Sequence, residues 1–163
     1  MTYKGHTLLD TALLPLPWFA YYANSPEEVI YFAGGSLLGA TLPDIDEPES
    51  YIGRRTRGVS DIIKAVLGHR GATLYLIVPL VIFVTAFFFP IEPILKHIIF
   101  GVAFGWLAHI IGDGLTVSGV RNGYFPLKKH YATLPKALRF KTGSIVEYGV
   151  IALLIALNAY IYT

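Results

Sequence analysis

The sequence contains no cysteine and few charged residues. Without cysteine the chain forms no disulfide and offers no thiolate to a metal ion, which leaves histidine and carboxylate side chains as the candidate ligands. Charged residues make up 15% of the 163 residues, whereas soluble domains carry about 25%. Hydrophobic residues make up 54%, and the mean hydropathy is +0.55. This composition indicates a membrane protein.

The chain also lacks internal repeats, low-complexity tracts and linker-like stretches. We therefore expect one domain over residues 1–163. The first residues carry an acid at Asp10, two prolines and no clean small-residue cleavage site, so we expect them to belong to the mature fold rather than to a signal peptide.

Apolar runs account for most of the sequence. The last three have 18 or 19 residues, and as helices of about 27 Å they are expected to cross a bilayer. The first two have 15 residues each and either cross a thinned bilayer or lie within the bundle. We predict an all-α integral membrane bundle of about five apolar helices, at residues 8–22, 29–43, 72–89, 94–112 and 144–162.

The basic residues fall on one side when these segments are threaded through a bilayer. The amino terminus and the loops at 44–71 and 113–143 receive 12 of the 13 lysines and arginines, and only Lys96 lies near the opposite side. Because cytoplasmic loops accumulate positive residues, we predict a cytoplasmic amino terminus. A soluble helical bundle is the alternative, but no segment shows the wide polar stripe of a solvated helix.

His109 and Asp113 form the strongest local pattern. They are four residues apart, so they share one face of a helix and can reach one ion. Within a membrane helix such groups are costly unless they are paired, hydrated or bound to a cation. A structural His–Asp hydrogen bond between helices is an equal alternative for this pair by itself.

A second pattern, Asp44-Ile45-Asp46, follows Pro43, which we expect to stop the preceding helix. Two carboxylates in a turn can converge on a cation, or one can bind while the other orients a ligand. Asp-x-Asp is common in loops, and we assign the neighbouring Glu47 and Glu49 to a solvated acidic rim.

The remaining candidates lie at other helix ends on the same side. His69 is a possible ligand, and the adjacent Arg70 suits a phosphate oxygen. A lone histidine or glutamate at a helix end is more often a cap, so the prediction depends on the whole set. We predict a metal site at the cytoplasmic end of the bundle, formed by His6, Asp44, Asp46, His69, His109, Asp113 and Glu147.

Two other histidines are excluded from the predicted site. His97 lies 12 residues before His109 on the same segment, about 18 Å along a helix axis. His130 lies in a basic loop and is interpreted as an interfacial residue.

Five ordered motifs resemble a known family, the membrane-bound metal-dependent hydrolases of the YdjM-like type, described as LexA-regulated inner-membrane proteins. The motifs are Gly5-His6, Pro43-Asp44-Ile45-Asp46 with Ser50, His69-Arg70-Gly71-x-Thr73, His109-x-x-x-Asp113-x-x-Thr116-x-x-Gly119, and Lys141-Thr142-Gly143-Ser144 with Glu147. The family usually continues the third motif with His-Ser, whereas this chain has Leu74-Tyr75. The order of ligands is also similar to that of the zinc-dependent phospholipases C and the related single-strand nucleases.

The resemblance implies a membrane-bound metal-dependent hydrolase that cleaves a phosphoester, either a lipid phosphate or a phospholipid. We expect one or two ions, Zn²⁺ first and Mn²⁺ second, with Asp44 or Asp46 as general base. Arg54, Arg55 and Arg70 would bind the phosphate. The expected partners are membrane lipid and a phosphate-bearing substrate, not nucleic acid. The alternatives are a non-enzymatic protein that binds or transports divalent metal, and a structural membrane protein.

Overall fold

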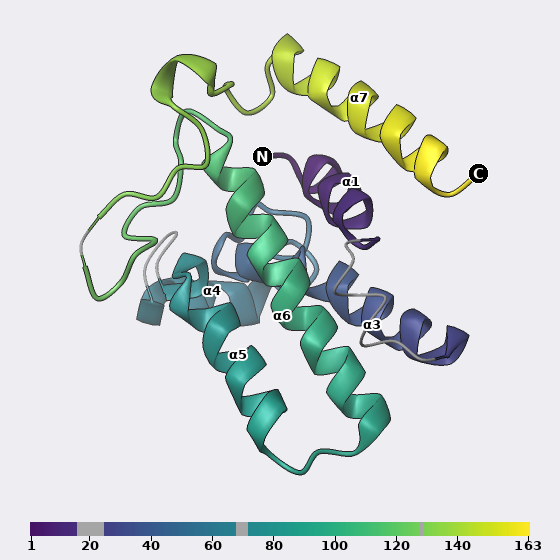
Figure 1. Cartoon of the computed structure of the whole chain (residues 1–163). Coiled ribbons are helices and arrows are strands. Elements are labelled where there is room, and N and C mark those ends of the chain that lie inside the picture. The colour runs from purple at the N-terminus through teal and green to yellow at the C-terminus, as the bar shows by residue number, and fades with distance from the viewer. Residues whose placement is uncertain (16–24, 68–71, 128) are drawn as a thin grey trace.

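The computed structural model describes residues 1–15, 25–67, 72–127 and 129–163. Over these residues the fold is all-α, with isolated β-bridges but no strand, which confirms the predicted class. The α-helices and short 3-10 helices (Figure 1) are α1 (Tyr3–Leu13), α3 (Pro26–Gly39), η1 (Leu42–Asp46), α4 (Arg57–Leu67), η2 (Ala72–Leu74), α5 (Ile77–Phe88), α6 (Pro93–Gly114), η3 (Lys136–Leu138) and α7 (Ile145–Ile161).

Helix α6 is central to the fold (Figure 1). Helices α1, α3 and α5 pack against it, and α7 packs on α1. With 22 residues, α6 is about 33 Å long. Within the described part of the chain it alone is long and apolar enough to cross a membrane.

Glycines bring α3 and α6 into backbone contact. A Cβ atom on Gly35 would lie 2.2 Å from the carbonyl oxygen of Ile98, and one on Gly105 would lie 1.9 Å from that of Ser36. Gly39 and Gly101 meet the opposite backbone equally closely. Small residues four positions apart allow such close helix packing in membranes. The approach places the end of α3 directly beside the last turns of α6.

Polar groups lie inside this fold, and large apolar side chains lie outside. His6 and His109 are buried, whereas Phe88 on α5 is 74% exposed and Ile145 on α7 is 86% exposed. A water-soluble protein buries such side chains, and a protein surrounded by lipid presents them outward. The arrangement supports the membrane interpretation of the composition.

Several predicted helix limits were wrong. In the segment predicted at 72–89 the α-helix begins only at Ile77, because Pro79 in the first turn would clash with the preceding backbone if it began earlier. Helix α1 begins at Tyr3 rather than at Leu8, so His6 lies inside it, while residues 16–24 of the first segment lie outside the described residues. Ser25 caps α3 and Pro26 is its first residue.

The sequence also predicted no helix in the loop at 44–71, where the structure has α4. This helix contacts η1. Its exposed face carries Val59, Ile62 and Val66, which are 54%, 66% and 75% exposed, while Ser60 is buried. Five spanning helices are not confirmed, because α5 has 12 residues and α7 has 17, and lengths of about 18 and 26 Å are short for a crossing.

Candidate metal centre

Helices α1 and α6 bring three predicted ligands together. His6 comes from α1, and His109 and Asp113 come from the last two turns of α6. All three are buried, and one ligand atom from each lies within 4.8 Å of the others. His109 and Asp113 share a helix face, as their spacing predicted.

The hydrogen bond of His109 determines which ring nitrogen is available. Nδ1 lies 2.7 Å from the carbonyl oxygen of Ala40, at the end of α3. A carbonyl only accepts, so Nδ1 carries the proton and Nε2 of the neutral ring keeps its lone pair. Nε2 is buried and makes no hydrogen bond. It lies 3.8 Å from Oδ2 of Asp113 and 3.6 Å from Oδ1 of Asp44.

His6 is neutral at physiological pH. Burial of the ring, together with the neighbouring His109, lowers the pKa of His6 to about 3. Its Nε2 lies 3.2 Å from Oδ1 of Asp113, and neither ring nitrogen makes a hydrogen bond of good geometry. Gly112 leaves space for the ring, because a Cβ atom there would lie 2.8 Å from Nδ1 of His6.

These spacings are close to those between the ligands of a divalent ion. Ligand bonds of about 2.0–2.2 Å place the corners of a tetrahedron roughly 3.3–3.6 Å apart. The observed nitrogen–oxygen separations are 3.2, 3.6 and 3.8 Å. Two neutral imidazoles and carboxylates are common zinc ligands, and the buried Nε2 of His109 without a hydrogen bond is otherwise an energetic cost.

Helix η1 carries the two predicted loop carboxylates at different depths. Asp44 faces His109, its side chain is 34% exposed, and burial raises its pKa. Asp46 is buried and accepts a 2.8 Å hydrogen bond from the Thr73 hydroxyl. Ser50 steadies this turn through a 2.8 Å bond to the Asp44 carbonyl. The pair thus lies in a 3-10 helix rather than in the irregular turn expected, and α3 ends at Gly39, before Pro43.

Glu147 lies at the start of α7, with both carboxylate oxygens engaged. Oε1 accepts a 2.6 Å hydrogen bond from the backbone N–H of Thr2, and Oε2 accepts one of 2.6 Å from that of Gly143. The side chain is buried and lies outside the group formed by His6, His109 and Asp113. It joins the start of α1, which carries His6, to the start of α7. The α-amino group of Met1 contacts Oδ1 of Asp113.

The predicted phosphate-binding arginines lie in the turn before α4. Both Arg54 and Arg55 are exposed. The guanidinium of Arg55 lies 3.7 Å from the ring centre of Tyr51, which stacks on Tyr3 of α1. His69 and Arg70, the other predicted ligand and phosphate contact, lie outside the described residues.

Two further positions bear on the sequence predictions. His97 lies toward the other end of α6, with Nδ1 2.8 Å from the Pro93 carbonyl and Nε2 3.6 Å from Glu28, so it does not join the centre. Leu74, where the resemblance led us to expect histidine, is buried in an apolar cluster with Ile110 and Val120. At this position the chain has apolar packing instead of an imidazole.

Sequence reasoning missed the groups that hold the ligands in place. The Ala40 carbonyl orients His109, and Thr73 binds Asp46 while its own carbonyl accepts a 2.6 Å hydrogen bond from the Trp106 indole. Thr73 belongs to the motif that begins at His69, but its spacing within that motif does not indicate that it bonds to Asp46. The Gly-x-x-x-Gly spacings at 35–39 and 101–105 were a usable signal for the close approach of α3 and α6.

Comparison with known proteins identifies a matching family and several relatives of this chain. Residues 1–163 match the family described as YdjM inner membrane protein. Inner membrane protein YdjM of Escherichia coli (strain K12) is 32% identical over 140 residues, covering 74% of this chain and 63% of the relative. The protein of the same name from Shigella flexneri matches equally, so the chain spans 63% of the length of these two relatives.

A third relative covers the chain almost completely. Uncharacterized protein YvsG of Bacillus subtilis (strain 168) is 34% identical over 163 residues, covering 99% of this chain and 94% of the relative. No solved structure matches the chain. With the family match extending from the first residue to the last, the chain belongs to the YdjM inner membrane protein family.

Proposed function

We propose that this protein is a multi-pass inner-membrane hydrolase that depends on a divalent metal and cleaves a phosphoester at the cytoplasmic face. The observation that carries the proposal is the convergence of His6, His109 and Asp113 with a buried lone pair on Nε2 of His109. A purely structural His–Asp contact would give that nitrogen a hydrogen bond. The proposed ion is Zn²⁺, with Mn²⁺ as the second candidate.

The three converging residues would hold the ion, and His69, assigned from the sequence, would complete its ligands. A bound divalent ion lowers the pKa of a coordinated water from about 15.7 to about 7 and neutralises phosphoryl charge. One or two ions are compatible with the number of carboxylates and imidazoles that the sequence offers.

Asp44 is the best-placed general base. It lies 3.6 Å from Nε2 of His109, and its side chain is partly exposed, so substrate and water can reach it. Its raised pKa favours proton uptake compared with an ordinary aspartate. In the proposed reaction Asp44 takes a proton from water as the water oxygen bonds to phosphorus. The ester P–O bond then breaks, and the leaving alcohol oxygen takes the proton.

Exposed basic residues in the turn before α4 suit a phosphate substrate. Arg54 and Arg55 are exposed in the turn before α4, and Arg70 is assigned to the same task from the sequence. The 12 basic residues on the predicted cytoplasmic side attract anionic lipid headgroups. A metal centre at the cytoplasmic end of the bundle would lie at the level of the lipid headgroups. A lipid phosphate or phospholipid is therefore the proposed substrate.

The membrane location has two supports. The Escherichia coli and Shigella flexneri relatives are named inner membrane proteins. The exposed apolar faces of α5 and α7 extend the apolar surface beyond α6, so the two shorter helices would complete the multi-pass arrangement together with it. The charge distribution supports a cytoplasmic amino terminus.

The test combines metal analysis with hydrolysis. Protein purified in lipid nanodiscs should contain a divalent metal and release phosphate from phosphatidic acid. Treatment with chelator should abolish release, and added Zn²⁺ or Mn²⁺ should restore it. His109→Ala should lose both the metal and the activity.

His97→Ala is the matched control, because His97 lies on the same helix but bonds to Pro93 at its other end. The His97→Ala variant should keep both the bound metal and the hydrolytic activity. Full metal content and activity in His109→Ala would contradict the proposal. Metal flux into proteoliposomes with no hydrolysis of any phosphoester would instead favour a transporter.

A further inference from the structure

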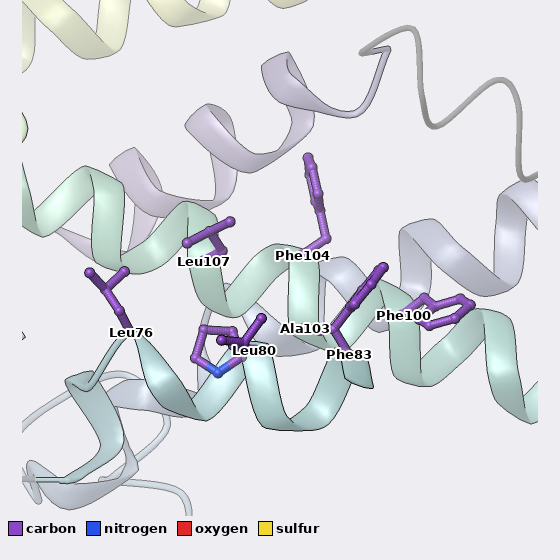
Figure 2. A pocket seen from close by; sticks show the side chains of 8 residues that line it. Leu76, Leu80, Phe83, Phe100, Ala103, Phe104 and Leu107 are labelled. Atoms are coloured by element: carbon purple, nitrogen blue, oxygen red, sulfur yellow. The ribbon is translucent and has the colours of Figure 1, made fainter. Parts of the chain in front are cut away.

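A wholly apolar pocket lies between α5 and α6. It has a volume of about 500 Å³. Figure 2 shows Leu76 and Leu107 at one end and Phe83 and Phe100 at the other, with Leu80 and Ala103 between them. The lining side chains offer no hydrogen-bonding group, so a polar ligand would lose its hydrogen bonds to water without replacing them.

The pocket begins below the level of the metal centre and extends along α6 toward the middle of the membrane, on a face of the helix turned away from His109. Leu107 precedes Asp113 by six residues and Phe100 precedes it by 13, which places them about 9 and 20 Å along the axis of α6. One leaflet contributes about 15 Å of a hydrocarbon core of roughly 30 Å. An acyl chain whose headgroup lies at the level of Asp113 would therefore enter the pocket at Leu107 and extend toward Phe100.

The end of the pocket near Leu107 is connected to the carboxylates by hydrogen bonds. Trp106, next to Leu107, donates a 2.6 Å bond to the Thr73 carbonyl, and the Thr73 hydroxyl donates a 2.8 Å bond to Asp46. Leu76 follows Thr73 closely and lines the same end. The upper end of the pocket and the buried carboxylate of Asp46 are thus supported by the same short segment.

We propose that this pocket binds one fatty acyl chain of the phospholipid substrate, with the phosphate directed toward the metal centre. The proposal rests on the proposed function for the identity of that lipid. The volume lies within the roughly 300–1,000 Å³ of small-molecule pockets, whereas a helix of a second copy, about 10 Å across, is too wide for a furrow between two packed helices.

The test uses two adjacent residues of α5 that are both exposed. Leu80 is 59% exposed and lines the pocket, and Val81 is 54% exposed and does not. Leu80→Trp fills the pocket from its open edge, and Val81→Trp adds the same ring outside it. Leu107→Trp on α6, at a residue that is 39% exposed, is a second blocking variant should Leu80→Trp fail to fold.

The first measurement does not require hydrolysis. Each protein is placed in phosphatidylcholine nanodiscs with phosphatidic acid that carries a diazirine on one acyl chain, and crosslinked residues are mapped by mass spectrometry. We expect crosslinks at Phe83 and Ala103 in the wild type and in Val81→Trp, and several-fold fewer in Leu80→Trp. Labelling of the exposed Ile155 on α7 should be equal in all three. Equal labelling of the pocket in both tryptophan variants would overturn the proposal.

The second measurement separates the pocket from the reaction. Leu80→Trp should raise the KM for long-chain phosphatidic acid several-fold and leave hydrolysis of soluble p-nitrophenyl phosphate unchanged. Unchanged kinetics for both substrates would overturn the acyl site. Specific crosslinks in a wild-type protein that hydrolyses nothing would support the acyl site and overturn the proposed function.

Discussion

The imidazole rings of His6 and His109 stack in parallel, with ring centres 3.7 Å apart and an angle of 6° between the planes. The contact joins α1 to the last turns of α6. Burial of the His6 ring beside His109 lowers the pKa of His6 and favours its neutral form. Neutral imidazole is the form that binds metal, so His6 is available as a ligand beside His109.

The backbone contact between α3 and α6 should be sensitive to one added methyl group. Gly35→Ala places its Cβ 2.2 Å from the Ile98 carbonyl, and overpacking of this kind typically costs about 1–3 kcal/mol. Moving α3 away from α6 would also pull the Ala40 carbonyl away from His109. Metal content should therefore fall together with the melting temperature. Gly34→Ala is the control, because a Cβ there meets nothing within 4 Å. Equal melting temperatures for both variants would contradict the close-packing argument.

Replacement of the proposed base should affect turnover more than metal content. Asp44→Asn removes proton uptake but keeps the size of the side chain, and loss of a general base typically lowers kcat by about 10²–10⁴. Metal analysis and phosphate release from the same preparation measure the two effects. Loss of the metal in Asp44→Asn would instead identify Asp44 as an essential ligand.

The two roles considered for Glu147 make different predictions. If its carboxylate anchors the start of α1 to α7, Glu147→Ala loses two charge-assisted hydrogen bonds, each worth about 1.5–3 kcal/mol. Glu147→Gln keeps a carbonyl acceptor and should recover much of the melting temperature and metal content. A glutamine variant that stays folded but loses the metal as completely as alanine would support the predicted role as a ligand.

The absence of cysteine allows a direct test of the predicted orientation. Glu27→Cys lies near the predicted outer side and Lys129→Cys in a predicted cytoplasmic loop, and both positions are exposed. A membrane-impermeant maleimide should label only Glu27→Cys in spheroplasts and only Lys129→Cys in everted vesicles. The reverse pattern would place the candidate metal centre on the outer face.

The candidate site was predictable where the signal was local. His109 and Asp113 share a helix face through their spacing alone, and Ser25-Pro26 marked the start of α3. The amphipathic helix α4 was missed because the segment that carries its basic residues was interpreted as a loop. Pro79 was overlooked as the reason that α5 begins late, although a proline within an apolar run is a visible boundary signal.

The sequence by itself determined the all-α class and the set of possible ligands, and it predicted that most basic residues lie on one side. These follow from composition and from spacing along a single helix. Only the tertiary structure decided which ligands converge, because His6 is separated from His109 by more than one hundred residues and reaches it through the packing of α1 on α6. It also showed how the Ala40 carbonyl sets the tautomer of His109 and how Thr73 holds Asp46. These contacts depend on the backbone approach of α3 to α6 and on the turn before α5, and helix periodicity does not specify either.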